Sequence, residues 1–214
     1  MPRVPIASED ERKFIVDGIQ SNFRNDGRNC RTYRPLLLAT DVINTANGSC
    51  LLKLVLRYEG NLHDACSFAM KAALSETKVP ALKVTHDEET NEVSVDVCDD
   101  PYEYGVLDVS NLPVLITVGQ INGVHTVDTT IKEDSVTLAR ITYGIKSSGS
   151  IVYMNKDGGG SLDLLNIRSM AKIASDIGPQ MNELLVKKIQ LSKEKQASWG
   201  HTNERLLFND DNFV

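Results

Sequence analysis

The sequence predicts an α+β fold, with a mostly antiparallel sheet and helices on one face of it. Three observations carry this prediction. Two β-rich runs, 112–121 and 124–134, flank Asn122-Gly123, and such a pair favours a tight hairpin because both residues tolerate the positive φ of a type I′ turn. Alternating apolar residues in 82–97 predict another hairpin. Apolar residues recurring from Leu164 to Lys188 predict a long closing helix.

The first fifty residues predict a helix followed by part of a hairpin. Ser8 with Glu11 forms a capping box. The helix after it places Phe14, Ile15, Ile19 and Phe23 at roughly helical spacing. Residues 36–43 are typical of an extended strand, and Asn47-Gly48 is the turn signal that ends this hairpin.

A nearly continuous apolar run, 51–58, predicts a central strand, and a helix is expected over 61–78. Asn61 is a favourable N-cap for this helix, and Pro80 should end it. Its helically spaced residues are mostly small, which predicts close packing: Leu62, Ala65, Cys66, Ala69, Ala72 and Ala73. Further along, Gly178-Pro179 should kink or break the closing helix.

These elements suggest three parts. Residues 1–50 would supply the N-terminal helix and partial hairpin, and residues 51–191 the remainder of the domain. Residues 192–214 are polar and are predicted to form a disordered tail.

Composition limits the possible functions. The 214 residues carry 29 acidic and 23 basic side chains, a formal net charge of -6. A chain of this charge is no general binder of polyanions, so contact with RNA requires a local basic patch or partner subunits. No apolar run approaches the ~20 residues of a membrane span, and the N-terminus lacks the apolar region of a signal peptide. We therefore expect neither membrane association nor secretion.

The cysteines and histidines do not predict a metal site. Four cysteines show no C-x-x-C pair, and we expect reduced thiols with two of them buried: Cys30, Cys50, Cys66 and Cys98. Four scattered histidines stand near no paired ligand and are expected on the surface or in hairpins: His63, His86, His125 and His201.

Three segments have both a functional and a structural interpretation. Asp157-Gly-Gly-Gly-Ser161 precedes a helix and either binds a phosphate with its backbone or is a plain loop. A cluster of acids either holds Mg²⁺ or is a solvated loop: Asp96, Asp99, Asp100, Glu103 and Asp108. Four arginines within eleven residues either contact RNA or a neighbouring subunit, or are solvated or paired locally: Arg24, Arg28, Arg31 and Arg34.

Three blocks of the sequence resemble the eukaryotic exosome core subunits of the RNase PH type. They lie in order between residues 8 and 190 and comprise 15–20, 25–28, 33–35 and 47–49; then 60–65, 71–74 and 79–80; then 99–102, 112–114, 127–128, 159–163 and the closing helix. The resemblance implies an RNase PH-like fold of the ribosomal protein S5 domain 2 type.

Two departures from the family pattern qualify this resemblance. After Cys50 the chain passes directly to the 51–58 strand, leaving no room for a βαβ crossover, which needs about 30 residues. We therefore expect a truncated domain, from alternative splicing or a faulty gene model. Active members place an acid just before the Leu-Pro of the 112–121 strand, where this chain has Asn111. An amide serves neither as a general acid nor as a charged Mg²⁺ ligand, so the resemblance is to the non-catalytic subunits.

The resemblance implies a non-catalytic subunit that supports 3′-to-5′ RNA processing and degradation, including rRNA maturation and mRNA decay. Its implied partners are other RNase PH-type subunits in a hetero-hexameric ring, RNA-binding cap subunits, and RNA in the ring channel. The implied locations are nucleus, nucleolus and cytoplasm. Arg24, Arg28 and Arg31 are the candidate contacts with RNA or a subunit; no catalytic residue, metal or cofactor is expected. The alternatives are a phosphate-dependent 3′-to-5′ exoribonuclease and a truncated form that does not assemble.

Overall fold

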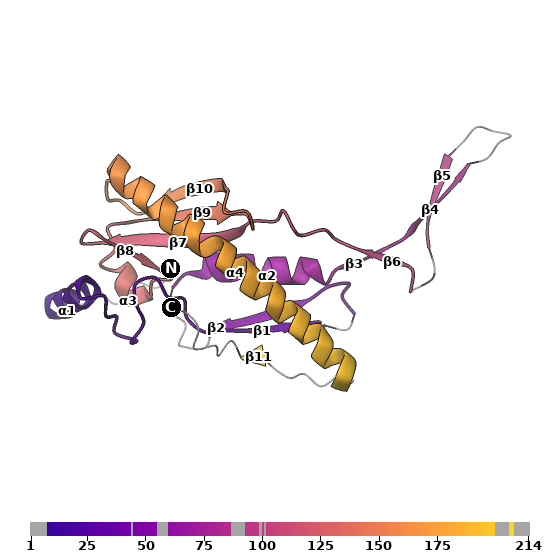
Figure 1. Ribbon diagram of the computed structural model, residues 1–214, viewed down its shortest axis with the longest axis horizontal. Coiled ribbons are helices and arrows are strands. Elements are labelled where there is room, and N and C mark those ends of the chain that lie inside the picture. The colour runs from indigo at the N-terminus through magenta and orange to yellow at the C-terminus, as the bar shows by residue number, and fades with distance from the viewer. Residues whose placement is uncertain are drawn as a thin grey trace.

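The computed structural model describes residues 8–43, 45–54, 60–86, 93–98, 100, 102–199 and 206–207 (Figure 1). In chain order its elements are α1 (Glu9–Gln20), β1 (Leu36–Thr40), β2 (Cys50–Leu54), α2 (Leu62–Ser75), β3 (Lys78–Pro80), β4 (Leu82–His86), β5 (Val93–Val97), β6 (Tyr104–Val106), β7 (Val114–Ile121), β8 (Val124–Val127), α3 (Ile131–Asp134), β9 (Ala139–Ile145), β10 (Ile151–Asp157), α4 (Leu164–Trp199) and β11 (Leu206–Leu207). The predicted α+β class is confirmed, and the pairings between the described strands are antiparallel.

The main sheet has the strand order β10-β9-β7-β8. The turn between β7 and β8 is the predicted one, since Asn122 and Gly123 have φ values of 44° and 83°. These positive angles match the twist of the two strands they join. On one face of the sheet, Val114, Ile116 and Val118 of β7 are buried beside Ile141 and its neighbours on β9.

Helix α4 crosses this face of the sheet (Figure 1) and contributes Met170, Ala174 and Met181 to the core. Of the kink or break predicted at Gly178-Pro179, the break was wrong, because α4 runs continuously through Pro179, and the kink stays a prediction. Gly178 is there for close packing: a Cβ at this position would lie 2.4 Å from Cγ2 of Ile145. The helix can approach β9 only because that side chain is absent.

Helix α2 packs into the same core through Phe68 and Ala72, so both long helices meet the predicted face. It also lies along the edge of β7 beyond the end of β8. There Ser67 Oγ accepts a hydrogen bond from the Leu115 N–H at 2.9 Å, and Asp64 Oδ2 accepts one from the Thr117 N–H at 2.9 Å. Side chains of α2 thus satisfy backbone donors that a further strand would otherwise pair with.

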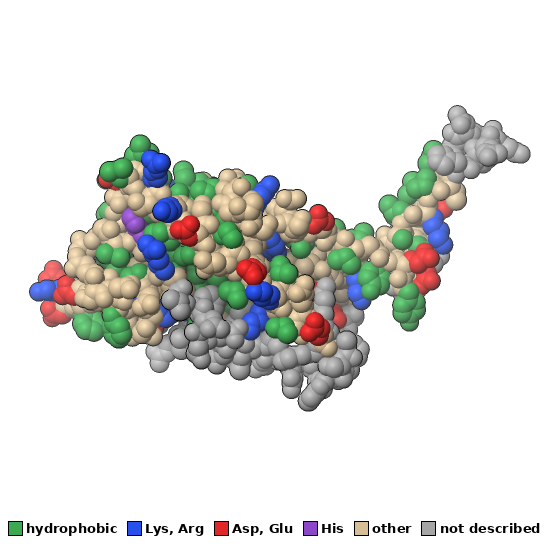
Figure 2. All heavy atoms as spheres, in the orientation of Figure 1, with side chains coloured by type: hydrophobic (Ala, Val, Ile, Leu, Met, Phe, Trp, Pro, Cys, Tyr) green, Lys and Arg blue, Asp and Glu red, His purple; other side chains and the backbone are tan. Residues whose placement is uncertain are grey.

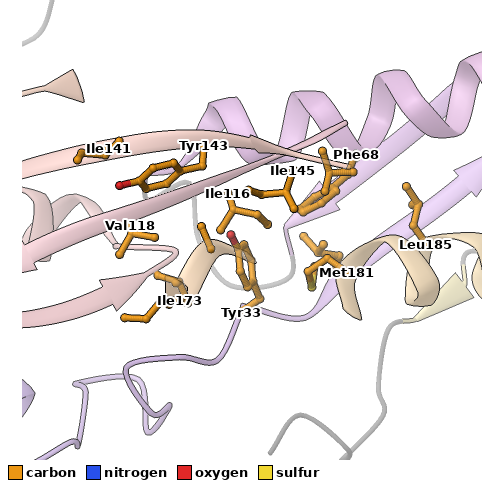
Figure 3. Close-up of a cluster of buried hydrophobic side chains, with 14 of the residues drawn as sticks. Tyr33, Phe68, Ile116, Val118, Ile141, Tyr143, Ile145, Ile173, Met181 and Leu185 are labelled. Atoms are coloured by element: carbon orange, nitrogen blue, oxygen red, sulfur yellow. The ribbon is translucent and has the colours of Figure 1, made fainter. Parts of the chain in front are cut away.

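A second small sheet has the order β11-β1-β2 and places β1 in its centre. Leu36 and Leu38 of β1 join the main core, together with Tyr33 just before it. Figure 3 shows Tyr33, Phe68 and Ile116 converging with Met181 and Leu185 of α4. Residues before and after position 50 therefore share one core. The predicted boundary between two parts of the domain at residue 50 stays a prediction.

The predicted boundaries of the C-terminal part need correction. Helix α4 continues to Trp199, and Ser192 is buried, with its Oγ 2.9 Å from Oγ1 of Thr40. Residues 206–207 pair with β1 as β11. The predicted disordered tail therefore does not begin at residue 192, while residues 200–205 and 208–214 lie outside the described residues.

An arm projects from the body on the side opposite α1 (Figure 1). Strands β3 and β6 form its base and β4 and β5 its outer part. The predicted hairpin over 82–97 is confirmed by the pairing of β4 with β5. Among the described residues, no helix combines the length and apolar character that a membrane crossing needs.

Candidate functional site

The arginine segment lies between α1 and β1, and the structure directs most of its charge inward. Arg24 is 1% exposed. Its Nε donates to Glu133 Oε1 at 2.8 Å, its Nη2 pairs with Glu133 Oε2, and its Nη1 donates to the Val127 carbonyl at 3.1 Å. Burial opposes the charge on Arg24, but Glu133 outweighs it, so the pKa of Arg24 is raised.

Local sequence places Glu133 for this pairing. Thr130 and Glu133 form a capping box on α3, in which the Thr130 N–H donates to Glu133 Oε2 at 2.8 Å. The same carboxylate thus caps a helix and neutralises Arg24. Arg24 and Glu133 are 109 positions apart in the sequence, so no local sequence pattern could predict that they pair.

Asp128 is the common partner of two other arginines of this segment, Arg28 and Arg34. Its Oδ2 accepts from Arg28 Nη1 at 2.8 Å and from Arg34 Nε at 3.0 Å, and its Oδ1 accepts from Arg34 Nη2 at 2.8 Å. Burial favours the neutral acid, but the hydrogen bonds and charge of Arg34 prevail, so the pKa of Asp128 is lowered. Asp128 and Asn61 both adopt left-handed backbone angles, with φ of 49° and 50°, and Asn61 Nδ2 donates to Asp128 Oδ1 at 3.2 Å.

This geometry corrects two of the three predicted contact residues. Arg24 is fully committed to Glu133 and to backbone carbonyls of the 127–128 segment. Arg28 pairs with Asp26 and Asp128, and its side chain is 9% exposed. Only the Arg28–Asp26 pair is the predicted local pairing; the pairs of Arg24 with Glu133 and of Arg28 with Asp128 are long-range and were not predicted. Neither side chain therefore presents its charge to RNA or to another subunit.

Arg31 is the exception. Arg31 is exposed, and its guanidinium lies close enough to His125 of β8 for an electrostatic interaction. His125 also faces Asn166 and Asp163 at the start of α4, and burial lowers its pKa. Arg31, the end of the β7–β8 hairpin and the first turn of α4 therefore lie together. Arg31 stays a candidate contact residue.

The sequence did not predict that two ionisable side chains of α2, Asp64 and Lys71, are buried. Asp64 is 1% exposed and accepts four hydrogen bonds, all from uncharged groups of Tyr33, Asn61 and Thr117. Burial raises the pKa of Asp64 to about 6. Lys71 is 3% exposed, and its Nζ donates to the Leu112 carbonyl at 2.6 Å and to Asn182 Oδ1 at 2.7 Å. Burial lowers the pKa of Lys71.

A helical pattern of apolar residues gives no sign of these two groups, because they occupy positions of α2 between its alanines. Neither group is open to solvent, so neither can act on an external substrate. They hold α2 against β7 and against α4, and their role is to fix the geometry of the core.

The remaining candidates resolve as follows. Asn111 is exposed at the turn before β7. Helix α4 is capped by Asp163, whose Oδ1 accepts from the Asn166 N–H at 2.8 Å. Asp96, Asp100, Glu103 and Asp108 belong to the arm and the chain that returns from it, and Asp99 lies outside the described residues. In the part of the chain that the structure describes, no three metal-binding side chains gather.

Of the four cysteines, Cys30 and Cys98 are buried, as the sequence predicted for two of them. Cys50 is half-buried and Cys66 is exposed.

Comparison with known proteins bears on these findings. Residues 111–177 match the family described as "3' exoribonuclease family, domain 2". The "Putative exosome complex exonuclease RRP42" of Dictyostelium discoideum is 32% identical over 137 residues, which is 64% of this chain and 42% of that protein. The "Exosome complex component Rrp42" of Thermococcus onnurineus is 33% identical over 135 residues, covering 63% of this chain and 47% of that protein. The chain thus spans less than half the length of these curated relatives.

Solved structures agree on the fold. A chain of the Archaeoglobus fulgidus exosome with RNA bound to the active site superposes with a TM-score of 0.62 at 19% identity, over 82% of this chain and 97% of that one. A chain of an archaeal exosome core gives a TM-score of 0.55 at 20% identity, over 83% and 96%. The sequence blocks named above resemble ribosomal RNA-processing protein 42, an RNase PH-type exosome subunit. The chain is therefore similar to Rrp42-type exosome components over nearly two thirds of its length, matches the second domain of the 3′ exoribonuclease family at residues 111–177, and has an RNase PH-like fold.

Proposed function

We propose that this protein is a non-catalytic, RNase PH-type subunit of the RNA exosome ring and supports 3′-to-5′ RNA processing and degradation. The observation that carries the proposal is the match to Rrp42 exosome components over nearly two thirds of the chain. The RNase PH-like fold agrees with it, because exosome chains superpose on most of this chain's length. The partners we propose are other RNase PH-type subunits, cap subunits and RNA in the channel, and the proposed locations are nucleus, nucleolus and cytoplasm.

We propose a non-catalytic subunit because of Asn111. This exposed amide stands where we expect active members to carry an acid, and it cannot donate a proton as a carboxylic acid does. The acids and bases that the structure gathers elsewhere are buried in ion pairs or in the core. The proposed contribution of this subunit is therefore surface and not catalysis.

We further propose that the chain is a shortened form of its relatives. After Cys50 it passes directly into the strand that precedes Gly60 and α2, which leaves no room for a crossover unit of about 30 residues. The structure suggests how a shortened form would remain folded: α2 side chains satisfy the β7 edge, and β1 pairs on both sides.

Reconstitution tests the function. We would co-express the full chain with the RNase PH-type exosome subunits of its own organism and analyse the product by native mass spectrometry. The expected result is a hetero-oligomer that contains this chain. A chain that stays alone while the other subunits assemble would support the alternative that the short form does not assemble.

An activity assay separates the subunit from the enzyme. The purified chain and its Asn111→Asp variant would be incubated with a 3′-labelled RNA and inorganic phosphate. We expect no phosphate-dependent release of nucleoside diphosphates from the unmodified chain. Release by the unmodified chain would establish the phosphorolytic alternative. Within an assembled ring, Arg31→Ala should weaken either RNA retention, in a salt-dependent way, or assembly.

A further inference from the structure

The outer part of the arm has one apolar face that nothing in the described structure covers. In an antiparallel pair, residues opposite each other point to the same side. Leu82 pairs with Val97 and Val84 with Val95, and Val93 lies two residues before Val95 on the same side of the strand. These five residues, which we call the apolar face of the arm, are each 54% to 63% exposed: Leu82, Val84, Val93, Val95 and Val97.

The opposite face of the same ribbon is polar. Lys83 pairs with Asp96, and Thr85 pairs with Ser94, with their hydroxyl oxygens 2.5 Å apart. Such alternation is typical of a sheet that packs one face against another body and leaves the other in water. An isolated two-stranded ribbon is marginally stable in water, so a partner on the apolar face would also order the arm.

The stretch of sequence from β4 to residue 103 is strongly acidic. Residues 82–103 contain eight of the 29 acidic side chains and one of the 23 basic ones, Lys83. Their formal charge is therefore -7, and the rest of the chain has a formal charge of +1. Figure 2 shows acidic and hydrophobic side chains side by side along the arm. A segment with this charge repels phosphates and attracts cationic surfaces.

Charge complementarity decides between the possible occupants. RNA would bring more negative charge to a segment that already carries -7. A second copy of this chain would bring an equally acidic arm, and like charges at an interface are unfavourable. A protein surface with an apolar strip bordered by lysine and arginine satisfies both features of the arm.

We infer that the arm is a docking element for a basic protein partner, which covers its apolar face. The base of the arm also has a shallow hollow, lined by Val79, Pro80, Tyr104 and Leu107. The five side chains of the apolar face form a small contact area, so binding through the arm alone is weak and reversible. This inference goes beyond the ring function and does not depend on it, since the arm projects away from the body.

Defined probes test the inference on the full chain. The probe is a fluorescent peptide of alternating valine and lysine, as long as one strand of the arm. Its controls are a valine–glutamate peptide, a serine–lysine peptide and an oligouridine. We expect saturable binding of the valine–lysine peptide, weakened by salt, and much weaker binding of all three controls.

Paired variants locate the binding. Val84→Thr with Val95→Thr keeps the β-branched shape but removes apolar contact, and it should weaken the valine–lysine peptide roughly tenfold or more. Thr85→Ser with Ser94→Thr alters the polar face and should leave binding unchanged. Asp96→Asn with Asp100→Asn leaves the apolar face intact and should reduce both affinity and its salt dependence. Far-ultraviolet circular dichroism checks that each variant is folded.

Four outcomes would overturn the inference. Equal binding of the valine–glutamate peptide would show that acidic charge does not select the partner. Equal binding of the serine–lysine peptide would show that the apolar face is not used. Binding of the oligouridine that Val84→Thr with Val95→Thr abolishes would identify RNA as the occupant. Dimerisation in sedimentation velocity that the same variant abolishes would identify a second copy of the chain.

Discussion

Arg24 shows how a residue that suggests binding by its sequence can be structural. Four arginines close together suggest a phosphate-binding patch because guanidinium groups suit phosphate oxygens. The carboxylates that engage them, Asp128 and Glu133, lie about a hundred residues later and come close only through the fold. The sequence predicted that this segment matters, but not which groups it would meet. Arg31, which is exposed, keeps the predicted role.

The first prediction separates these two roles. Arg24→Ala should lower the free energy of unfolding by roughly 3–5 kcal/mol, because it leaves Glu133 buried without its partner. Arg31→Ala, at an exposed position, should change it by less than about 0.5 kcal/mol. Urea denaturation of both variants measures the difference. Equal stability losses would mean that Arg24 is not held as the structure shows.

Asp64 gives the second prediction, which concerns pH. Its folded pKa of about 6 lies above the ordinary value of 3.8, so the folded chain holds this proton more tightly than the unfolded chain. The contribution of Asp64 to stability is therefore full below the lower value and is lost as the pH rises to the upper one. The total loss is about 3 kcal/mol.

Variants isolate this effect from other titrating groups. Asp64→Asn cannot titrate, so its stability relative to the unmodified chain should improve as the pH rises over that window. Asp17→Asn, which removes an exposed carboxylate outside the core, is the control. Chemical denaturation across the window provides the free energies. A constant difference for Asp64→Asn would refute the raised pKa.

At the scale of elements, sequence patterns predicted the features that depend on neighbouring residues alone, such as helix caps and hairpin turns. Ser8 caps α1 through the Glu11 N–H, and Asn122-Gly123 makes the hairpin turn. The predictions that failed concern features that depend on contacts between elements far apart in the sequence. The burial pattern of α2 includes Asp64 and Lys71 because β7 and α4 supply their partners, and no periodicity within the helix contains that information.

Gly178 provides the third prediction, in which packing reverses a helix rule. Replacing glycine by alanine inside a helix ordinarily stabilises it by about 1 kcal/mol. Here the new Cβ would overlap Ile145, so Gly178→Ala should instead destabilise the protein by roughly 1–3 kcal/mol. Gly159→Ala is the control, because nothing lies within 4 Å of a Cβ built there.

A double-mutant cycle makes this test specific. Ile145→Ala removes Cγ2 and Cγ1, which lie 2.4 and 3.1 Å from the new Cβ, keeps the Ile145 Cβ at 2.6 Å, and leaves a cavity, so it relieves part of the overlap. The effects of Gly178→Ala and Ile145→Ala should therefore be non-additive, with the double variant more stable than their sum. Additive effects in thermal denaturation would show that α4 and β9 are not in close contact at this point.

At the scale of the whole molecule, one core connects segments that the sequence assigned to different parts. Tyr33, Leu36 and Leu38 pack with residues of α2, β7 and α4. Helix α4 continues past residue 191, where the sequence predicted the domain to end, and Ser192 reaches Thr40 of β1. Sequence reasoning placed a boundary where the family pattern is interrupted. It could not foresee that α2 and β11 would supply the partners that the interrupted sheet needs.

The last prediction tests whether this core folds as one unit. Regions that open together exchange their amide hydrogens at similar rates, whereas a weakly attached region exchanges faster. Because β1 pairs on both sides and Leu38 is 1% exposed, its paired amides should be protected to the same degree as those of β7 from Val114 to Val118. Native-state hydrogen exchange followed by mass spectrometry measures both segments in one experiment, and the arm serves as the fast-exchanging reference. Much faster exchange in β1 than in β7 would instead favour the division at residue 50, with an N-terminal part that opens independently of the remaining domain.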